Sequence, residues 1–237
     1  MKKNLIGTVA VFAAAFLGGA ASAQDGHDWT GAYVGIHGGF GKSDISGVYD
    51  SPDARRNDLF VDDGQGYFEM APKDFVGGAQ LGYNWQVGHV VFGGEADLSQ
   101  ADWYQELRYA SDDDLLSVEM DWMATARARA GYSFDNLLVY ATGGLAWTNM
   151  RFTGNDDYRR TSRRETGIVD FDKTGLALGG GTEYAINDHF SVKADALLIS
   201  FDDIINTARL EADERKPGDF VKLDDMFLAR VGINYRF

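Results

Sequence analysis

The sequence predicts an all-β protein, an eight-stranded antiparallel barrel that crosses a membrane with its strands. Three observations support this: apolar and polar residues alternate in eight segments, long and short connections alternate, and the chain begins with an export signal. The clearest segment is residues 226–237, where every odd position is apolar and the even positions are mostly small or polar. Such alternation gives a strand one apolar and one polar face. The segment ends on Phe237, a ring that suits a bilayer interface.

Residues 1–23 are predicted to be a secretory signal peptide. Lys2 and Lys3 are followed by an apolar run over residues 5–20, and residues 21–23 (ASA) match a small-x-small cleavage site. A membrane anchor is the alternative, but the run is short and interrupted by glycines. Cleavage after residue 23 would leave one domain, residues 24–237. No later segment reaches the ~20 apolar residues of a spanning helix.

The strands are expected in chain order, each on the same alternation argument. Their predicted ranges are residues 29–42, 75–86, 90–99, 117–132, 137–148, 174–184, 190–200 and 226–237. The first opens with Ala32, Val34 and Ile36 on the apolar face, and the sixth is the weakest because it is rich in glycine.

The connections between these strands have two lengths. Those at 87–89, 133–136 and 185–189 are short, whereas those at 43–73, 101–116, 149–173 and 201–223 are long, polar and hold all three prolines. Short turns on one side, long loops on the other and an even strand number are typical of outer-membrane barrels. Closure would leave no unpaired edge in lipid.

The composition fits sheets with tight bends, because the chain has 29 Gly, 3 Pro and 13% aromatic residues. With no cysteine, disulfides, thiolate metal sites and thiol catalysis are excluded. Without Lys2 and Lys3 the chain has 20 basic and 36 acidic side chains, a net charge of −16. This acidity argues against nucleic acid as a partner.

Charged residues collect on the faces expected to point inward, with signs close to balanced. An eight-stranded barrel is only wide enough for side chains to fill it, so we expect a paired charge network that plugs the lumen. The alternative is a narrow path for ions or small solutes. The predicted lumen network is Glu95, Asp97, Glu119, Asp121, Arg127, Arg129, Glu183, Lys193, Asp195, Arg230 and Arg236.

A soluble barrel with the two faces exchanged is the other architecture that alternation allows. The signal peptide, the charge pairing and the placement of aromatic residues near strand ends favour the membrane barrel. The aromatic residues expected at the interfaces are Trp29, Tyr83, Trp85, Tyr132, Trp147, Tyr184, Phe190, Tyr235 and Phe237.

Candidate chemistry outside the lumen is sparse, and we predict neither a catalytic nor a cofactor nor a metal site. The four histidines lack metal-ligand spacing, and His37 is expected to point into the lumen without a Ser-Asp pattern beside it. The basic run Arg159, Arg160, Arg163 and Arg164 could bind lipopolysaccharide phosphates. The alternative is a solvated loop that offsets neighbouring acids, which is the more common role of surface charges.

Several strand motifs resemble the small outer-membrane barrels of rhizobial and brucella-type bacteria, which are related to opacity and OmpA-like proteins. They are residues 29–35 (WTGAYVG), 77–84 (GGAQLGYN), 126–132 (ARARAGY), 140–146 (YATGGLA) and the ending 235–237 (YRF). The resemblance covers the strands but not the loops.

The resemblance implies a surface-exposed antigen of the bacterial outer membrane. We expect its partners to be lipid and lipopolysaccharide, and we expect a monomer, although the sequence does not determine the oligomeric state. Tyr235 and Phe237 would form the C-terminal signal that the assembly machinery recognises. Some relatives are called porins, and some bind heme, which here would depend on loop tyrosines such as Tyr49, Tyr104 or Tyr158. A structural and surface-interaction protein, a weak pore and a ligand-binding receptor are therefore the three functional hypotheses.

Overall fold

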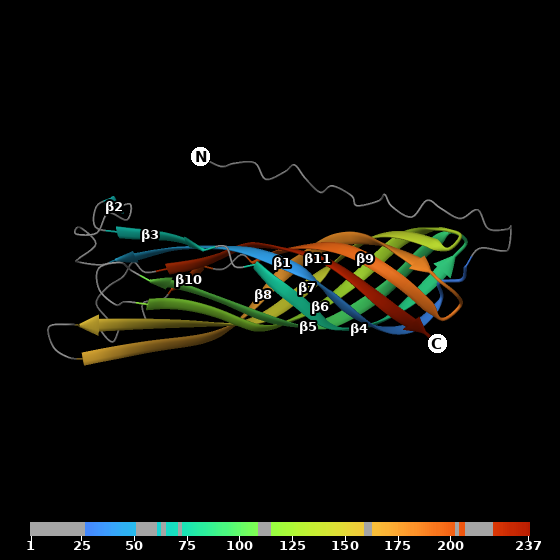
Figure 1. Ribbon diagram of the computed structural model, residues 1–237. Helices are drawn as coiled ribbons and strands as arrows, with labels where there is room; N and C mark the ends of the chain where they lie inside the picture. Colours follow the sequence, from blue (N-terminus) through green and yellow to red (C-terminus); the bar gives the residue numbers. More distant parts are fainter. Residues whose placement is uncertain are drawn as a thin grey trace.

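The computed structural model is a closed antiparallel barrel of eight long strands (Figure 1). It describes residues 27–50, 61–62, 65–70, 73–108, 115–158, 163–201, 204–206 and 220–237. The predicted signal peptide lies outside these residues and stays a prediction. The barrel strands are β1 (Gly31–Asp50), β4 (Lys73–Val87), β5 (Val90–Arg108), β6 (Leu115–Phe134), β7 (Leu137–Tyr158), β8 (Arg163–Ala185), β9 (Phe190–Ser200) and β11 (Phe220–Arg236).

Each barrel strand pairs with its sequence neighbours, and β11 pairs with β1 to close the ring. The closing register runs from Tyr33 opposite Arg236 to Val48 opposite Phe220. Three short strands extend the sheet at one end of the barrel. β3 (Gln65–Met70) pairs with β1, β2 (Val61–Asp62) pairs with β3, and β10 (Ile204–Asn206) pairs with β11. The predicted fold class is therefore confirmed.

The described part of the chain contains no helix with the length and apolar character of a membrane span.

The connections predicted as long loops are in large part strand. β7 and β8 stay paired from Leu137 opposite Tyr184 to Tyr158 opposite Arg163, and this hairpin extends past the rest of the barrel (Figure 1). β5 and β6 likewise pair as far as Arg108 opposite Leu115. Alternation could not reveal these extensions, because a strand with polar groups on both faces has no period-two signal.

The outer face of the barrel wall is apolar, as lipid requires. Its most exposed side chains include Ile36 (67%), Phe40 (70%) and Leu81 (61%). Of the aromatic residues predicted for the interfaces, Trp147 is half-buried and seven others are exposed: Tyr83, Trp85, Tyr132, Tyr184, Phe190, Tyr235 and Phe237. Trp29 is the exception. It is buried inside the short-turn end of the barrel, so its predicted interfacial position is wrong.

A β-bulge in β6 reverses the facing of the residues before it. Asp121 and Trp122 are both exposed, whereas Met120 and Met123 on either side are both buried. Asn149 of β7 stabilises the bulge: its Oδ1 accepts the backbone N–H groups of Asp121 (3.3 Å) and Trp122 (3.1 Å), and its Nδ2 donates to Asp121 Oδ2 (2.8 Å). An extra residue in one strand is the usual origin of such a reversal.

Inward glycines allow neighbouring strands to approach closely inside this narrow barrel. A Cβ on Gly39 would collide with the Ala229 carbonyl oxygen, and one on Gly144 with the Ala126 carbonyl oxygen. The tight curvature of eight strands therefore depends on residues without side chains at these points.

Candidate functional site

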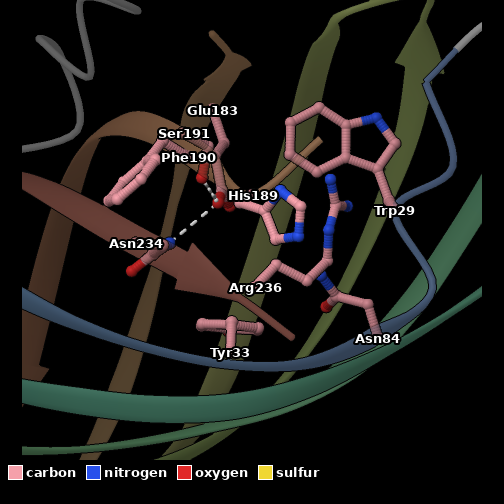
Figure 2. Close-up of a pocket in the computed structure, with 9 residues that line it drawn as sticks. All are labelled: Trp29, Tyr33, Asn84, Glu183, His189, Phe190, Ser191, Asn234 and Arg236. Atoms are coloured by element: carbon pink, nitrogen blue, oxygen red, sulfur yellow. Dashed lines mark hydrogen bonds between the residues drawn. The ribbon is translucent and has the colours of Figure 1, made fainter. Parts of the chain in front are cut away.

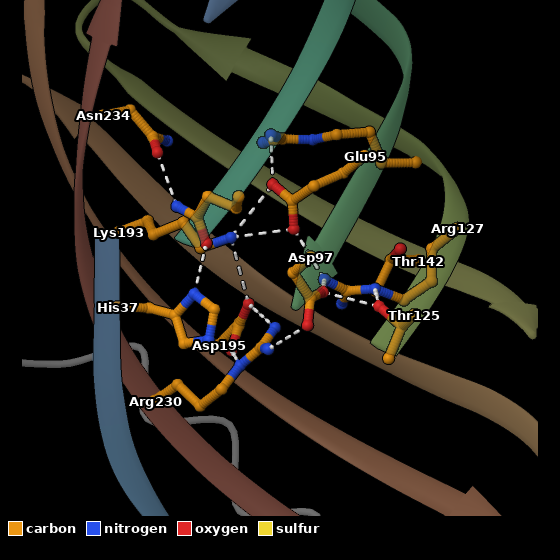
Figure 3. Close-up of polar contacts among 12 residues, drawn as sticks. His37, Glu95, Asp97, Thr125, Arg127, Thr142, Lys193, Asp195, Arg230 and Asn234 are labelled. Atoms are coloured by element: carbon orange, nitrogen blue, oxygen red, sulfur yellow. Dashed lines mark hydrogen bonds and ion pairs between the residues drawn. The ribbon is translucent and has the colours of Figure 1, made fainter. Parts of the chain in front are cut away.

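The barrel interior is the candidate site, and eight charged side chains lie buried together within it. Figure 3 shows Glu95, Asp97, Arg127, Lys193, Asp195 and Arg230 of this set. Four of the eight are acids and four are bases, so the set is neutral, and each is at most 6% exposed. We call this set the charge layer: Glu95 and Asp97 from β5, Arg127 and Arg129 from β6, Glu183 from β8, Lys193 and Asp195 from β9, and Arg230 from β11. The strand alternation directs all eight to the same side of the wall.

Arg230 and Arg127 connect the acids on one side of the layer. Arg230 donates from Nε and Nη2 to the two oxygens of Asp195, each at 2.9 Å, and from Nη1 to Asp97 at 3.1 Å. Arg127 Nη2 lies 2.7 Å from Asp97 and 2.6 Å from Glu95. Two-point pairing of a guanidinium with a carboxylate is a strong and directional interaction.

Glu95 and Glu183 bind the remaining bases. Lys193 Nζ donates to both oxygens of Glu95 at 2.8 and 2.9 Å. Arg129 donates to Glu183 at 2.9 Å, and Ser191 and Asn234 also donate to that carboxylate, at 2.6 and 2.7 Å. Every ion of the layer therefore has an opposite charge beside it, as burial in a low-dielectric interior demands.

His37 lies beside the charge layer and points into the lumen, as the sequence predicts. Its ring nitrogens lie 3.1 Å from Gln80 Oε1 and 2.9 Å from Ser99 Oγ. Ser99, His37 and Gln80 are therefore connected in the way that a nucleophile, a base and a group that orients the base are connected in a hydrolase. All three residues are buried within the lumen, with Ser99 0%, Gln80 3% and His37 6% exposed.

An apolar cluster fills the lumen on the side of the long connections, and we call it the apolar stopper. β5 shows the order: Val91 lies near the short turn, Glu95 and Asp97 follow, and Ala101 and Trp103 lie beyond them. Gly41 of β1 leaves room for the Trp103 ring, with which a Cβ would collide. The stopper consists of Val76, Ala101, Trp103, Val118, Met120, Met123, Ala146, Met150, Ala177, Leu197, Ile199, Phe201, Met226 and Leu228.

Sequence reasoning missed the apolar stopper, although a signal was present. In residues 197–199 both faces are apolar, since Leu197 and Ile199 point inward while Leu198 points outward. A strand segment that is apolar on both faces indicates a dry interior at that height. The bulge in β6 concealed two further members of the stopper. The regular alternation places Val118 and Met120 on the outer face, but the bulge turns them inward.

Trp29 is buried at the other end of the lumen, near the short turns, and Figure 2 shows it among the residues that line a small pocket there. Its indole N–H donates to Ser133 Oγ at 3.0 Å, and its backbone N–H donates to Gln86 Oε1 at 2.7 Å. It clusters with Val91, Leu138, Tyr140 and Ala185. The small hollow beside it has room for about one water molecule.

Arg236 lies at this short-turn end of the lumen and not in the charge layer, so its predicted position is wrong. Its guanidinium donates to the backbone carbonyls of Asp28 (2.6 Å) and Asp188 (3.1 Å), and it lies 5.6 Å from the centre of the Trp29 ring system. It also contacts His27. Burial, and then the positive charge of Arg236, lower the pKa of His27, so that its neutral ring can accept an N–H from Arg236.

Two further residues predicted for the lumen network lie elsewhere. Asp121 faces out from the bulge, and Glu119 is half-exposed beyond it, so neither lines the charge layer. The bulge is the physical reason in both cases, because one extra residue exchanges the two faces of the strand.

The other predicted site residues lie at the two ends of the barrel. Tyr235 and Phe237 are exposed at the short-turn end, with ring centres 5.3 Å apart. Arg159 and Arg160 lie outside the described residues, and Arg163 and Arg164 belong to β8 without described side chains. Tyr104 is exposed, while the side chains of Tyr49 and Tyr158 are not described. Within the described ranges, no group of three or more metal-ligating residues comes together.

Known proteins of the same kind match this chain along most of its length. Residues 11–237 match the family described as outer membrane protein beta-barrel domain. The 31 kDa outer-membrane immunogenic protein of Brucella melitensis is 32% identical over 224 residues, which cover 92% of this chain and 87% of the relative.

Two solved structures are similar in fold alone, since their sequences are distant. OprG of Pseudomonas aeruginosa has a TM-score of 0.52 and 17% identity, over 90% of this chain and 98% of that one. The outer-membrane protease OmpT of Escherichia coli has a TM-score of 0.54 and 8% identity, over 90% of this chain and 99% of that one.

Proposed function

This chain belongs to the family of outer-membrane proteins with a β-barrel domain, and on that basis we propose that it acts as a closed scaffold in the bacterial outer membrane. The barrel would anchor the strand extensions of β7 and β8 at the cell surface, where they contribute to surface recognition. Its firm closure would contribute to envelope integrity.

The observation that supports this proposal is that three groups of buried side chains fill the lumen one after another along the barrel axis. The apolar stopper, the charge layer and the cluster around Trp29 occupy successive heights, and each consists of side chains that are almost fully buried. Ions cannot pass an apolar constriction of this kind without losing their hydration. The same fillings support a role other than catalysis, because they bury the Ser99–His37 pair.

A weak pore is the alternative, and conductance in planar bilayers separates the two. We expect refolded protein to give no steady channels at neutral pH, while heat-modifiable gel migration shows that the inserted sample is folded. Steady channels from the unaltered protein would refute the closed scaffold. A variant with Trp103→Gly and Met120→Gly serves as the opened control, since both side chains belong to the apolar stopper.

We further propose that β11 presents the assembly signal and that the barrel works as a monomer among lipids. Tyr235 and Phe237 are exposed at the end of the closing strand, where another protein could contact them before the β1–β11 pairing forms. Replacing Phe237 by Ala should lower the yield of folded barrel in cells but leave refolding of purified protein in detergent unchanged. Equal loss in both settings would count against recognition by machinery.

A further inference from the structure

Residues 27–30 precede β1 and lie at the short-turn end of the lumen, and we call them the N-terminal segment. The pairing of β1 with β4 begins after this segment, so side-chain contacts hold it in place. Trp29 is buried, and Thr30 Oγ1 accepts the backbone N–H of Gln86 at 3.1 Å. The backbone N–H of Thr30 donates to Asp28 Oδ1 at 2.9 Å, which holds the segment in a turn. The segment therefore packs against the barrel without being part of its wall.

His27 and Arg236 contact each other beside the Trp29 ring. The His27 ring meets the Trp29 ring edge to face, with ring centres 4.8 Å apart. A guanidinium has N–H groups but no acceptor, so the His27 nitrogen that faces Arg236 must accept the hydrogen bond. Only a neutral ring offers such an acceptor. A protonated ring would lose this hydrogen bond and would place two positive charges in contact.

Acids as well as Arg236 face His27. They are Asp28 of the N-terminal segment, Asp188 of the turn between β8 and β9, and Glu183 of β8. The same turn supplies His189, which lines the small hollow at this end. Glu183 is already paired with Arg129 at 2.9 Å. Burial and the charge of Arg236 outweigh the three acids and lower the pKa of His27, so uptake of a proton favours release of the segment.

We propose that the N-terminal segment is a pH-sensitive latch, which covers the short-turn end of the lumen while His27 is neutral and opens when His27 takes up a proton. A released segment carries an ordinary histidine, which titrates at about pH 6.5. The latch is therefore closed at neutral pH and weakens below that value. Opening admits water to the cluster around Trp29 but leaves the apolar stopper at the other end in place, so the latch does not depend on the closed scaffold.

Hydrogen exchange of the Trp29 backbone N–H, followed by NMR on the folded barrel in a neutral detergent, tests the latch. This group donates to Gln86 Oε1 at 2.7 Å, so its protection factor reports how firmly the segment is closed. Protection, corrected for the intrinsic exchange rate, should fall by up to about tenfold from about pH 7.5 to about pH 5.5. His27→Gln should show no fall, and the permanently charged His27→Lys should be weakly protected at both pH values. His89→Gln is the matched control, because His89 is a second histidine at the short-turn end.

Support requires the fall in the unaltered protein and in His89→Gln, its absence in His27→Gln, and weak protection in His27→Lys. A fall of less than about twofold in the unaltered protein, or an equal fall in His27→Gln, would overturn the latch. So would weak protection of His27→Gln at the higher pH, full protection of His27→Lys, or loss of the fall in His89→Gln. An equal fall at the backbone N–H of Ile36, inside the paired region of β1, would also overturn it, because the whole barrel would then be loosening. Channel conductance, which tests the closed scaffold, is independent of these measurements.

Discussion

Replacing Arg230 by Met should destabilise the barrel strongly, because it leaves buried carboxylates without their main partner. Arg230 makes three hydrogen bonds, two to Asp195 and one to Asp97. Removing one member of a buried ion pair costs roughly 3–5 kcal/mol. Arg127 still contacts Asp97, and Lys193 still lies 3.3 Å from Asp195, so the lower end, about 3 kcal/mol, is expected here.

Urea unfolding in lipid vesicles measures this loss, with the fluorescence of the five tryptophans as the signal. Adding Asp195→Asn to the same chain restores charge balance in the layer, and we expect it to recover at least half of the lost free energy of unfolding. A cost of less than about 1 kcal/mol for Arg230→Met, the value typical of solvated ion pairs, would refute a dry interior at the charge layer.

Three other replacements test separate features. Trp103→Ala leaves a cavity in the apolar stopper and should cost about 3–5 kcal/mol in urea unfolding; a cost near zero would show that the ring does not fill the lumen. Asn149→Ala removes the acceptor for two backbone N–H groups at the bulge, and the same assay should show a loss of about 1–2 kcal/mol, with no change if water substitutes for the amide. Gly144→Ala should abolish the heat-modifiable folded band, whereas Gly94→Ala, where a Cβ meets nothing closer than 3.9 Å, should retain it. A folded Gly144→Ala barrel would contradict the close strand approach.

The strand number, the closure and the direction of most side chains could be predicted from the sequence, because lipid outside and ions inside impose a period of two. Lys193 and Asp195, for example, follow directly from their alternation with Val192 and Ala194. The pairing of each ion with a particular partner could not, since it depends on the register of strands far apart in the chain. Arg230 meets Asp97 across the lumen, 133 residues away.

Where prediction failed, a local rule was interrupted. The bulge at Asp121 changed the phase of β6, and nothing in the alternating pattern before or after it marks the extra residue. The residue type of Trp29 predicts a position at the lipid interface, but its hydrogen bond to Ser133 holds it inside the short-turn end of the barrel. The outer halves of β7 and β8 have a mostly polar sequence without regular alternation, which predicts a loop although the backbone there stays paired.

The pairing of β1 with β11 joins the two ends of the described chain, and this has a bearing on export. Until those strands meet, each would carry a row of unsatisfied amides, which hydrocarbon penalises by several kcal/mol apiece. A chain that ends before residue 220 lacks β11 and cannot close the barrel, so it is not stable within the bilayer even when its other hairpins have formed. Such fragments should remain in the periplasm, where chaperones bind them and proteases degrade them. Only a chain that contains both closing strands should insert stably.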